Sequence, residues 1–394
     1  MNGTIYMPVG EVCSSISDTY REKKNMVTLI NTSDVLEGRV LNHERVPNSN
    51  LKGQFKKTFQ RDDILYSEIR PQNRRFAYVD FSPIDYIAST KLMVIRAKKD
   101  VVSPKYLYYF LKNSSTVAEL QLLAETRSGT FPQITFSEVA NLTIPVPSLA
   151  VQEVIVQTMQ CLEDKITCNE QINDNLEQQA QAIYHERFET VSPNDLPSDW
   201  RIVTLGEVAT ISNKSFNPLK EPEILLEHYS IPAFDEARFP AFELSTSIKS
   251  NKFIIDASCF MISKLNPTTK RVWKPYCLTG NAVCSTEFIV YKAKDKTITD
   301  FLYSVIDSNS FSDFMCSHVT GSTGSRQRTT PSDTLSYELI LPSEDELAEF
   351  QSLVSPMYAQ IRINAIENDR LKRLRDSLLP KLMSGEIDVS TIQL

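Results

Sequence analysis

The segment Asn173-Asp174-Asn175-Leu176 recurs 195 positions later as Asn368-Asp369-Arg370-Leu371. Further matches on either side keep nearly the same offset: Gly10-Glu11-Val12 and Gly206-Glu207-Val208, Ser89-Thr90 and Ser285-Thr286, Pro147-Ser148 and Pro342-Ser343. This offset is about half of the 394 residues, so the repeat spans the whole chain. It is far longer than the roughly 20–50 residues of a solenoid repeat and indicates a duplicated module of domain size. Two similar halves predict a target that also has two similar halves.

Composition predicts a soluble globular protein, with 41% apolar and 23% charged residues. We find neither a run of about 18 apolar residues nor the features of a signal peptide. The seven cysteines are odd in number and lack paired spacing, which predicts free thiols in a reducing cytoplasm. The net charge of -7 argues against nucleic acid when taken alone. Binding DNA requires only a local basic patch, however.

Each half begins with a mixed α/β region. Runs of β-branched and aromatic residues predict strands, and Pro104 predicts the first turn of a helix that continues to Leu111. The predicted strands are Ile64–Ile69, Leu92–Ile95, Phe253–Ile255, Cys259–Ile262 and Phe288–Tyr291. The proline-containing segment Leu142–Pro147 is expected to end regular structure in the first half.

Each half ends in a long helical segment. No Pro or Gly occurs from Ser148 to Phe188, and a helix of that length would extend roughly 60 Å. The second helix is expected to start at the capping box Ser343-x-x-Glu346 and to stop near Gly385. Pro356 is expected to break or kink it.

These patterns predict an α+β fold with two mixed α/β recognition domains, a long antiparallel two-helix coiled-coil spacer and a pseudo-twofold internal repeat. The expected divisions are domain 1 at 1–147, helix 1 at 148–188, a linker at 189–199, domain 2 at 200–342, and helix 2 with a tail at 343–394.

Steps of four and three along the two helices define matching, mostly apolar stripes. In the second helix the stripe is Met357, Ile361, Asn364, Asn368, Leu371, Arg375, Leu378 and Leu382. Its copy in the first helix is Leu162, Ile166, Asn169, Asn173, Leu176, Ala180, Ile183 and Arg187. Asparagine in such a seam costs stability but specifies register and partner. We expect the helices to pair with each other near these asparagines; the alternative is that each helix packs only on its own domain.

Two pairs of basic, polar loops are the candidate DNA-binding segments, because Arg and Lys contact phosphate or guanine while Gln and Asn can read adenine. The first pair offers Arg70, Gln72, Asn73, Arg74 and Arg75, and 196 positions later Asn266, Thr268, Thr269, Lys270 and Arg271. The second pair offers Thr130 and Gln133, and later Ser325, Arg326, Gln327 and Arg328. Ordinary solvated hairpins or turns are the alternative for both pairs.

No catalytic motif stands out. We find no phosphate-binding loop, no dinucleotide fingerprint, no Asn/Asp-Pro-Pro-aromatic tetrapeptide and no nuclease cluster of carboxylates and lysine. The four histidines are far apart and lack cysteines at zinc-ligand spacing, so no metal site is expected. Catalysis by this chain is therefore not expected.

The ordered motifs resemble those of the DNA-specificity subunit of type I restriction–modification systems. The motifs are Leu196-Pro197-x-x-Trp200 leading into Leu205-Gly206-Glu207-Val208, the Leu-x-Ile-Pro-Val-Pro segment at Leu142–Pro147, and Leu379-Pro380-Lys381-Leu382-Met383. The first half departs from the pattern. It lacks the Leu-Pro-x-x-Trp start, and its helix ends in Tyr184-His185-Glu186-Arg187.

This resemblance implies a non-catalytic reader of double-stranded DNA, in which each domain reads one half of a bipartite, asymmetric site. The helices would set the half-site spacing and dock two methyltransferase subunits. Those partners would hold S-adenosylmethionine and methylate adenine, and motor–nuclease subunits could join for cleavage in phage defence. The alternative is a pseudo-symmetric scaffold that binds no DNA and joins two identical protein partners.

Overall fold

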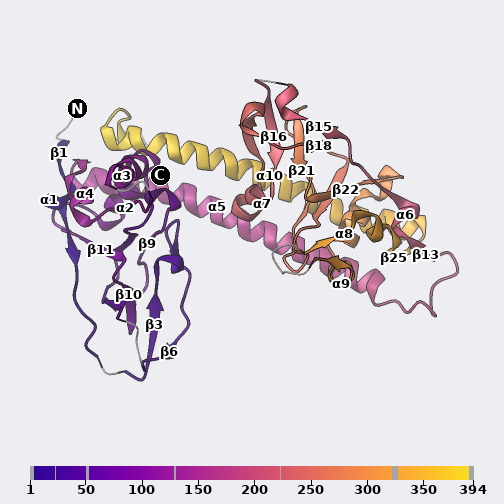
Figure 1. Cartoon of the computed structure of the whole chain (residues 1–394), viewed down its shortest axis with the longest axis horizontal. Helices are drawn as coiled ribbons and strands as arrows, with labels where there is room; N and C mark the ends of the chain where they lie inside the picture. Colours follow the sequence, from indigo (N-terminus) through magenta and orange to yellow (C-terminus); the bar gives the residue numbers. More distant parts are fainter. Residues whose placement is uncertain are drawn as a thin grey trace. The chain divides into compact units, whose positions relative to one another are not determined.

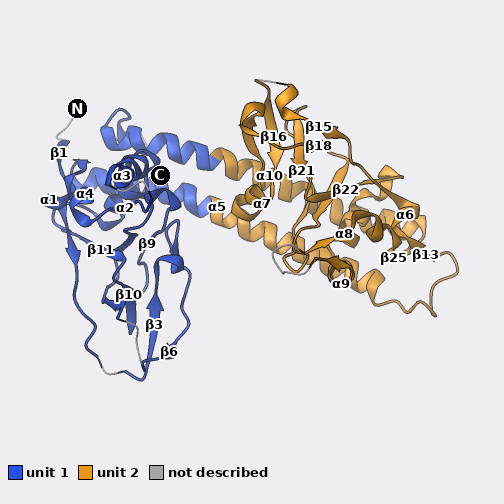
Figure 2. Ribbon diagram, viewed as in Figure 1, with its two compact units in different colours: residues 1–165, 371–394 blue, residues 166–370 orange. Residues whose placement is uncertain are grey.

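The computed structural model describes residues 4–22, 24–49, 53–127, 130–221, 223–321 and 327–389 (Figure 1). The chain divides into two compact units, which Figure 2 colours separately. Unit 1 comprises Met1–Lys165 and Leu371–Leu394, and unit 2 comprises Ile166–Arg370. Both long helices, α5 (Leu149–Tyr184) and α10 (Glu344–Ser384), contribute one part to each unit. The domain divisions expected above remain a proposal.

Unit 1 contains short helices and several small sheets. Its helices are α1 (Val9–Val12), α2 (Pro104–Lys112), α3 (Ser114–Arg127) and α4 (Phe136–Asn141). One sheet has the order β2 (Cys13–Ile16), β11 (Leu92–Ala97), β8 (Ile64–Ser67), β9 (Phe76–Tyr78). Another has the order β6 (Val46–Pro47), β3 (Met26–Ile30), β10 (Tyr86–Ser89), β7 (Phe55–Lys57). Two further pairs are β1 (Ile5–Pro8) with β12 (Thr143–Val146) and β4 (Val35–Leu36) with β5 (Arg39–Val40).

Unit 2 repeats this plan with local additions. Its short helices are α6 (Leu205–Val208), α7 (Ile231–Ala237), α8 (Thr299–Ile306) and α9 (Asn309–Ser317). One sheet has the order β14 (Ala209–Ile211), β22 (Phe288–Ala293), β19 (Cys259–Ser263), β20 (Val272–Trp273). Another has the order β15 (Ser215–Phe216), β18 (Lys252–Ile254), β21 (Ala282–Ser285), β16 (Leu225–Tyr229), β17 (Ala241–Leu244). Two further pairs are β13 (Arg201–Thr204) with β25 (Glu338–Leu341) and β23 (Val319–Thr320) with β24 (Arg328–Thr329).

Equivalent strands occupy equivalent places in the two units. The order β2-β11-β8-β9 in unit 1 returns as β14-β22-β19-β20 in unit 2. A parallel pair also returns, because β3 lies beside β10 as β16 lies beside β21. The predicted α+β class and the internal repeat are therefore confirmed.

The repeated Gly-Glu-Val motif marks a close helix contact in each unit. A Cβ atom on Gly10 would lie 3.0 Å from Cβ of Ala140 in α4. A Cβ atom on Gly206 would lie 3.2 Å from the carbonyl oxygen of Leu335. Glycine recurs at both positions because a side chain there would collide with the opposing segment.

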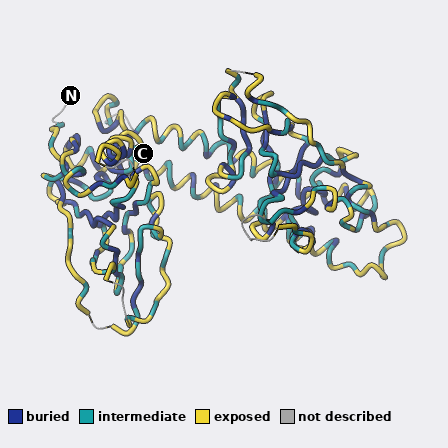
Figure 3. Tube along the Cα trace, in the orientation of Figure 1, coloured by how far each residue is buried: buried dark blue, intermediate teal, exposed yellow. Residues whose placement is uncertain are grey.

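Both long helices complete the apolar core of each unit, and Figure 3 shows buried segments gathered inside each unit. The unit 1 core includes Met159 of α5 and Leu382 of α10, both buried among strand residues. The unit 2 core includes Tyr184 of α5 and Phe350 of α10. Helix α10 ends as predicted at Gly385, whose φ of 77° is the left-handed conformation typical of a helix C-cap.

The expected end of regular structure at Leu142–Pro147 and the expected break at Pro356 are both wrong. The segment Leu142–Pro147 does not end regular structure, because β12 pairs antiparallel with β1 and Pro145 lies opposite Tyr6. A two-stranded sheet leaves each strand one open edge, where a residue without an N–H is tolerated. Pro356 does not break α10, which is continuous from Glu344 to Ser384. The buried Phe350 and Val354 hold this part of the helix on the unit 2 core and offset the roughly 3 kcal/mol that proline costs.

Candidate nucleic-acid interface

In unit 1 the structure brings the two predicted binding segments together. The backbone N–H of Arg70 donates to the carbonyl oxygen of Pro132 at 3.1 Å. The N–H of Ile134 donates to the carbonyl of Glu68 at 2.9 Å, and a β-bridge joins Ile69 to Gln133. Two loops that are about 60 residues apart in the chain therefore form one surface.

Unit 2 has the equivalent backbone hydrogen bonds between its own two loops. The N–H of Asn266 donates to the carbonyl of Gln327 at 3.0 Å, and that of Thr329 donates to the carbonyl of Lys264 at 3.2 Å. A β-bridge joins Leu265 to Arg328. These contacts connect the residues that the repeat offset assigns as equivalents of the unit 1 contacts.

The two loops also share an unusual backbone conformation. Arg70 and Asn266 have φ angles of 44° and 48°, in the left-handed region that non-glycine residues seldom adopt. A tight turn follows in both, with Asn73 N–H bonded to Arg70 O at 2.9 Å and Thr269 N–H bonded to Asn266 O at 2.8 Å. The same backbone frame thus displays Arg-Pro-Gln-Asn in unit 1 and Asn-Pro-Thr-Thr in unit 2.

Some predicted side chains point to solvent in this frame. Arg70, Gln72, Asn73 and Thr130 of unit 1 are exposed, as are Thr268 and Thr269 of unit 2. Asn266 is half-buried, and its Oδ1 atom has no hydrogen-bond partner among the described residues. Ser325 and Arg326 lie outside the described residues, as do Ser128 and Gly129 of the matching loop.

Most of the other predicted cations have contacts within their own unit. In unit 1, Arg74 Nη2 donates to Ser114 Oγ at 2.8 Å and Arg75 Nη1 to the carbonyl of Ser33 at 3.0 Å. Gln133 Oε1 accepts from Lys91 at 3.3 Å. In unit 2, Lys270, Arg271 and Arg328 form ion pairs with Asp307, Asp235 and Glu287.

The predicted helix seam lies partly in each unit. In unit 2, Asn169, Asn364 and Asn368 are buried and Asn173 is half-buried. Ile166 is buried beside Asn368, whose Nδ2 donates to its carbonyl at 3.4 Å. Ile183, Met357 and Ile361 pack against the unit 2 core, whereas Leu162 and Leu378 pack against the unit 1 core. Leu176 and Leu371 are half-buried.

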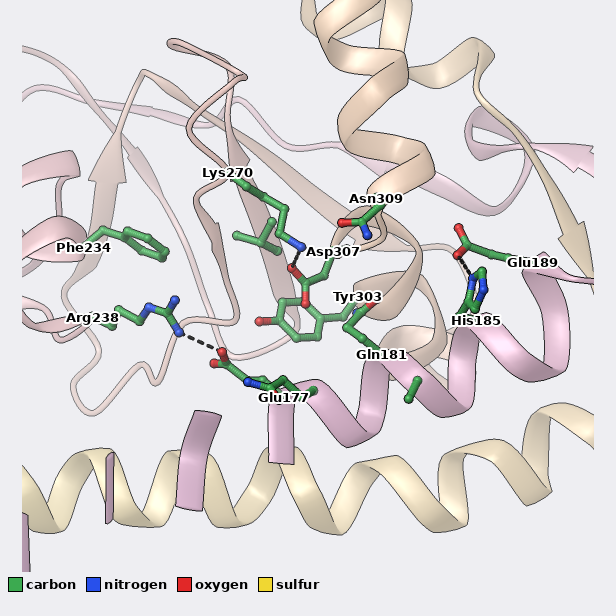
Figure 4. Close-up of a pocket in the computed structure, with 13 residues that line it drawn as sticks. Glu177, Gln181, His185, Glu189, Phe234, Arg238, Lys270, Tyr303, Asp307 and Asn309 are labelled. Carbon is green, nitrogen blue, oxygen red and sulfur yellow. Dashed lines mark hydrogen bonds and ion pairs between the residues drawn. The ribbon is translucent and has the colours of Figure 1, made fainter. Parts of the chain in front are cut away.

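Sequence reasoning missed a charged cleft of about 440 Å³ in unit 2, which Figure 4 shows. Arg238 Nη1 donates to Glu177 Oε2 of α5 at 2.7 Å, and Lys270 Nζ lies 2.9 Å from Asp307 Oδ1. Burial raises the pKa of Glu177 and of Asp307, although Arg238 and Lys270 act against this. The repeat offered no signal for this cleft, because at the offset of 195 Asp307 corresponds to Lys112 and Glu177 to Lys372.

Other site types find little support. Among the described residues, no group of three or more His, Cys, Asp or Glu side chains could hold a metal ion. No helix in this part of the chain has the length and apolarity that crossing a membrane requires. All seven cysteines are free.

Comparisons with known proteins agree with this geometry. Residues 6–178 match the model of the Type I restriction modification DNA specificity domain. The chain is 29% identical over 433 residues to the Type I restriction enzyme HindI specificity subunit of Haemophilus influenzae, covering 92% of this chain and 94% of that protein. It is 25% identical over 348 residues to the MjaIX specificity subunit of Methanocaldococcus jannaschii, covering 79% of this chain and 77% of that protein.

Solved structures show the same fold. The specificity subunit of a type I system from M. genitalium gives a TM-score of 0.53 at 15% identity, covering 97% of this chain and 96% of that chain. A chain from a study of complex assembly and conformational transition in a type I system gives 0.51 at 19% identity, covering 98% and 99%. The resemblance to DNA-specificity subunits of type I restriction–modification systems is therefore confirmed.

Proposed function

We propose that this chain is the sequence-reading subunit of a type I restriction–modification complex and has no catalytic role of its own. Unit 1 reads one half of a bipartite, asymmetric site in double-stranded DNA, and unit 2 reads the other half. The observation that carries this proposal is the matched loop frame. Its backbone hydrogen bonds are kept in both units, while the exposed residues change from Arg70, Gln72 and Asn73 to Thr268, Thr269 and Lys270. A kept frame with altered exposed side chains suits two readers of different base sequences.

The repeat also supports the choice of protein partners. Two copies of one methyltransferase subunit dock on the repeated helices, because equivalent surfaces bind identical partners. Those partners carry S-adenosylmethionine and methylate adenine, and motor–nuclease subunits can join for cleavage. The complex works in the cytoplasm, where the seven free cysteines stay reduced.

A domain exchange tests this function. Residues 1–147 are replaced by the equivalent segment of another specificity subunit, and the methylated sites are mapped in cells that contain the partner methyltransferase. One half-site should change while the other half-site and the spacer length are kept. A change in both half-sites, or in neither, contradicts separate reading by the two units. Absence of sequence-specific methylation with the native chain would instead favour a protein scaffold.

A spacer insertion tests the role of the helices. One helical turn is added to each long helix at the boundary of the units, between Lys165 and Ile166 in α5 and between Arg370 and Leu371 in α10, and the methylated sites are mapped again. The half-sites should be unchanged and the tolerated spacer longer. An unchanged spacer length contradicts the proposal that the helices measure the distance between half-sites.

A further inference from the structure

The two matched loops differ in what surrounds their cations. In unit 1 the Arg70 guanidinium is exposed, and within the described part of the chain no hydrogen bond or ion pair involves it. Arg74 bonds a hydroxyl and Arg75 a carbonyl, and both of these acceptors are neutral. Glu37 Oε1 lies 4.0 Å from Arg74 Nε, at the outer limit of an ion pair. The positive charge of this loop is therefore largely uncompensated.

In unit 2 each described cation of the paired loops faces a carboxylate. Arg271 makes two parallel bonds to Asp235, at 2.6 and 2.8 Å, and its side chain is only 13% exposed. Arg328 makes two bonds to Glu287, at 2.9 and 3.1 Å. Lys270 Nζ lies 2.9 Å from Asp307 Oδ1. Charge-assisted and bidentate pairs of this kind are strong and geometrically specific, so these cations serve the loop itself.

The whole segments show the same asymmetry. Residues 1–147 hold 19 Lys and Arg against 15 Asp and Glu, whereas residues 200–342 hold 15 of each. The net charge of -7 for the whole chain therefore comes from the helical and linking segments. A segment with a net positive charge attracts phosphate over about 10 Å at 0.1 M salt, whereas a segment without net charge does not.

Ion pairs through α7 also connect the Asn266–Arg271 loop of unit 2 to helix α5. Asp235 lies on α7, and Arg238 at the C-cap of α7 bonds Glu177 of α5 at 2.7 Å (Figure 4). Asp307, at the end of α8, accepts Lys270 in the same cleft. Two chains of ion pairs thus hold the Asn266–Arg271 loop in place inside unit 2. Thr268, Thr269 and Lys270 are its exposed residues, and of these only Lys270 is charged and faces a carboxylate, that of Asp307.

We propose that the two units engage DNA by different physical means. Unit 1 supplies salt-dependent phosphate contacts through Arg70, whereas unit 2 reads its half-site mainly through the uncharged Thr268 and Thr269. Asp235, Asp307 and Glu287 are positioning residues that keep the unit 2 loop neutral and rigid. This inference rests on the proposed function.

A salt titration of the complete complex tests the proposal. The chain with its methyltransferase subunits is bound to a duplex that carries the mapped site, and the affinity is measured from 50 to 300 mM KCl. Arg70→Gln should weaken binding at low salt and reduce the slope of log K against log[salt] by about 1, the value for one lost phosphate contact. Lys270→Gln should leave the slope unchanged. Lys99→Gln in unit 1, where the exposed Lys99 pairs with Asp62 at 2.6 Å, is the control for a change in net charge.

The slopes measured for the variants decide between the proposal and its alternatives. Equal slope changes for Arg70→Gln and Lys270→Gln, or a change for Lys270→Gln alone, would overturn the division between the units. Thr268→Val should relax selectivity at the unit 2 half-site without changing the slope. Asp235→Asn should make the slope steeper, because the Arg271 guanidinium is no longer neutralised and can contact phosphate. An unchanged slope for Asp235→Asn would show that Asp235 does not keep the loop neutral, which also overturns the proposal. Circular dichroism melting checks that each variant folds. If the native complex shows no site-specific binding, the proposed function itself fails.

Discussion

Asn169 Nδ2 lies 2.8 Å from Oδ1 of Asn368, where α5 and α10 pair inside unit 2. The equivalent residues of the repeat make a second contact, in which Asn364 Nδ2 lies 2.8 Å from Oδ1 of Asn173. Each remaining Nδ2 group reaches a backbone carbonyl, from Asn368 to Ile166 at 3.4 Å and from Asn173 to Ile361 at 3.5 Å. Residue numbers rise along α5 while those of the partners on α10 fall, so the two helices pair antiparallel. The two asparagine contacts are related by a local twofold axis.

The asparagine contacts predict how the stabilities of single and double variants compare. Asn169 is buried, and its Nδ2 also donates to Glu367 Oε2 at 2.7 Å. Asn368→Leu removes one of these two acceptors and should lower the stability of unit 2 by about 1–3 kcal/mol. The double variant Asn169→Leu/Asn368→Leu replaces both partners by apolar groups and should recover most of that loss. Urea unfolding followed by circular dichroism measures both. A double variant that loses the sum of the two single effects would show that the asparagines do not act as a pair.

The close contact at Gly206 predicts intolerance to any side chain. Gly206→Val places atoms where the Leu335 carbonyl already lies 3.2 Å from the Cβ position, and should cost about 2–3 kcal/mol. Gly280 is the matched control, because nothing lies within 4 Å of its Cβ position. Gly280→Val should change stability by no more than about 0.5 kcal/mol. Thermal melts of the two variants compare them directly, and equal losses would contradict the packing explanation.

The Arg238–Glu177 pair predicts a pH-dependent defect. Burial raises the pKa of Glu177, nearby Asp307 raises it further, and Arg238 opposes both. Arg238→Gln should therefore raise this pKa again. A carboxyl group with a raised folded-state pKa stabilises the fold below its unfolded pKa of about 4.3, and this stability is lost as pH rises through the folded value. Relative to the native chain, the variant should lose stability from pH 5 to pH 8.

The matching control removes the carboxylate. Glu177→Gln/Arg238→Gln leaves no charge in this part of the cleft, so its unfolding midpoint relative to the native chain should not fall over the same pH range. A pH-independent defect in Arg238→Gln would indicate lost packing and not an uncompensated charge.

His228 predicts a loss of stability in acid. Burial and nearby Lys252 lower the pKa of His228, although its hydrogen bond to Glu243 at 3.0 Å raises it. Its Nε2 atom has no hydrogen-bond partner among the described residues. Because the folded pKa lies below the unfolded value of about 6.5, the unfolded chain takes up a proton first as pH falls. Stability is therefore lost as pH falls below about 6.5.

Urea midpoints at pH 7.5 and pH 5.5 test the role of His228. His228→Gln should reduce the difference between the two midpoints, and His185→Gln, at an exposed position, should leave it as in the native chain. A full acid response in His228→Gln would assign the effect to other groups.

Local pattern predicted both long helices and several strands, because Phe288–Tyr291 and Cys259–Ile262 are β-branched and aromatic runs that suit a buried strand. It failed at Pro145 and Pro356, where tertiary contacts outweighed the local preference. For the site, recurrence identified the loops at Arg70 and Asn266. It did not show that each loop bonds a second segment about 60 residues further on, since that pairing arises only when the sheet and the following helices assemble.

The sequence by itself determined the duplicated module, the asparagine-bearing helix stripes and the loops where basic and polar residues recur. These features depend on periodicity and spacing, which are properties of the chain alone. Only the tertiary structure decided which cations are available. Arg70 and Arg271 are chemically identical side chains in matching loops, yet one is exposed and the other is held by Asp235. The physical reason is that an ion pair depends on distance in space, and Asp235 lies 36 residues from Arg271 in sequence.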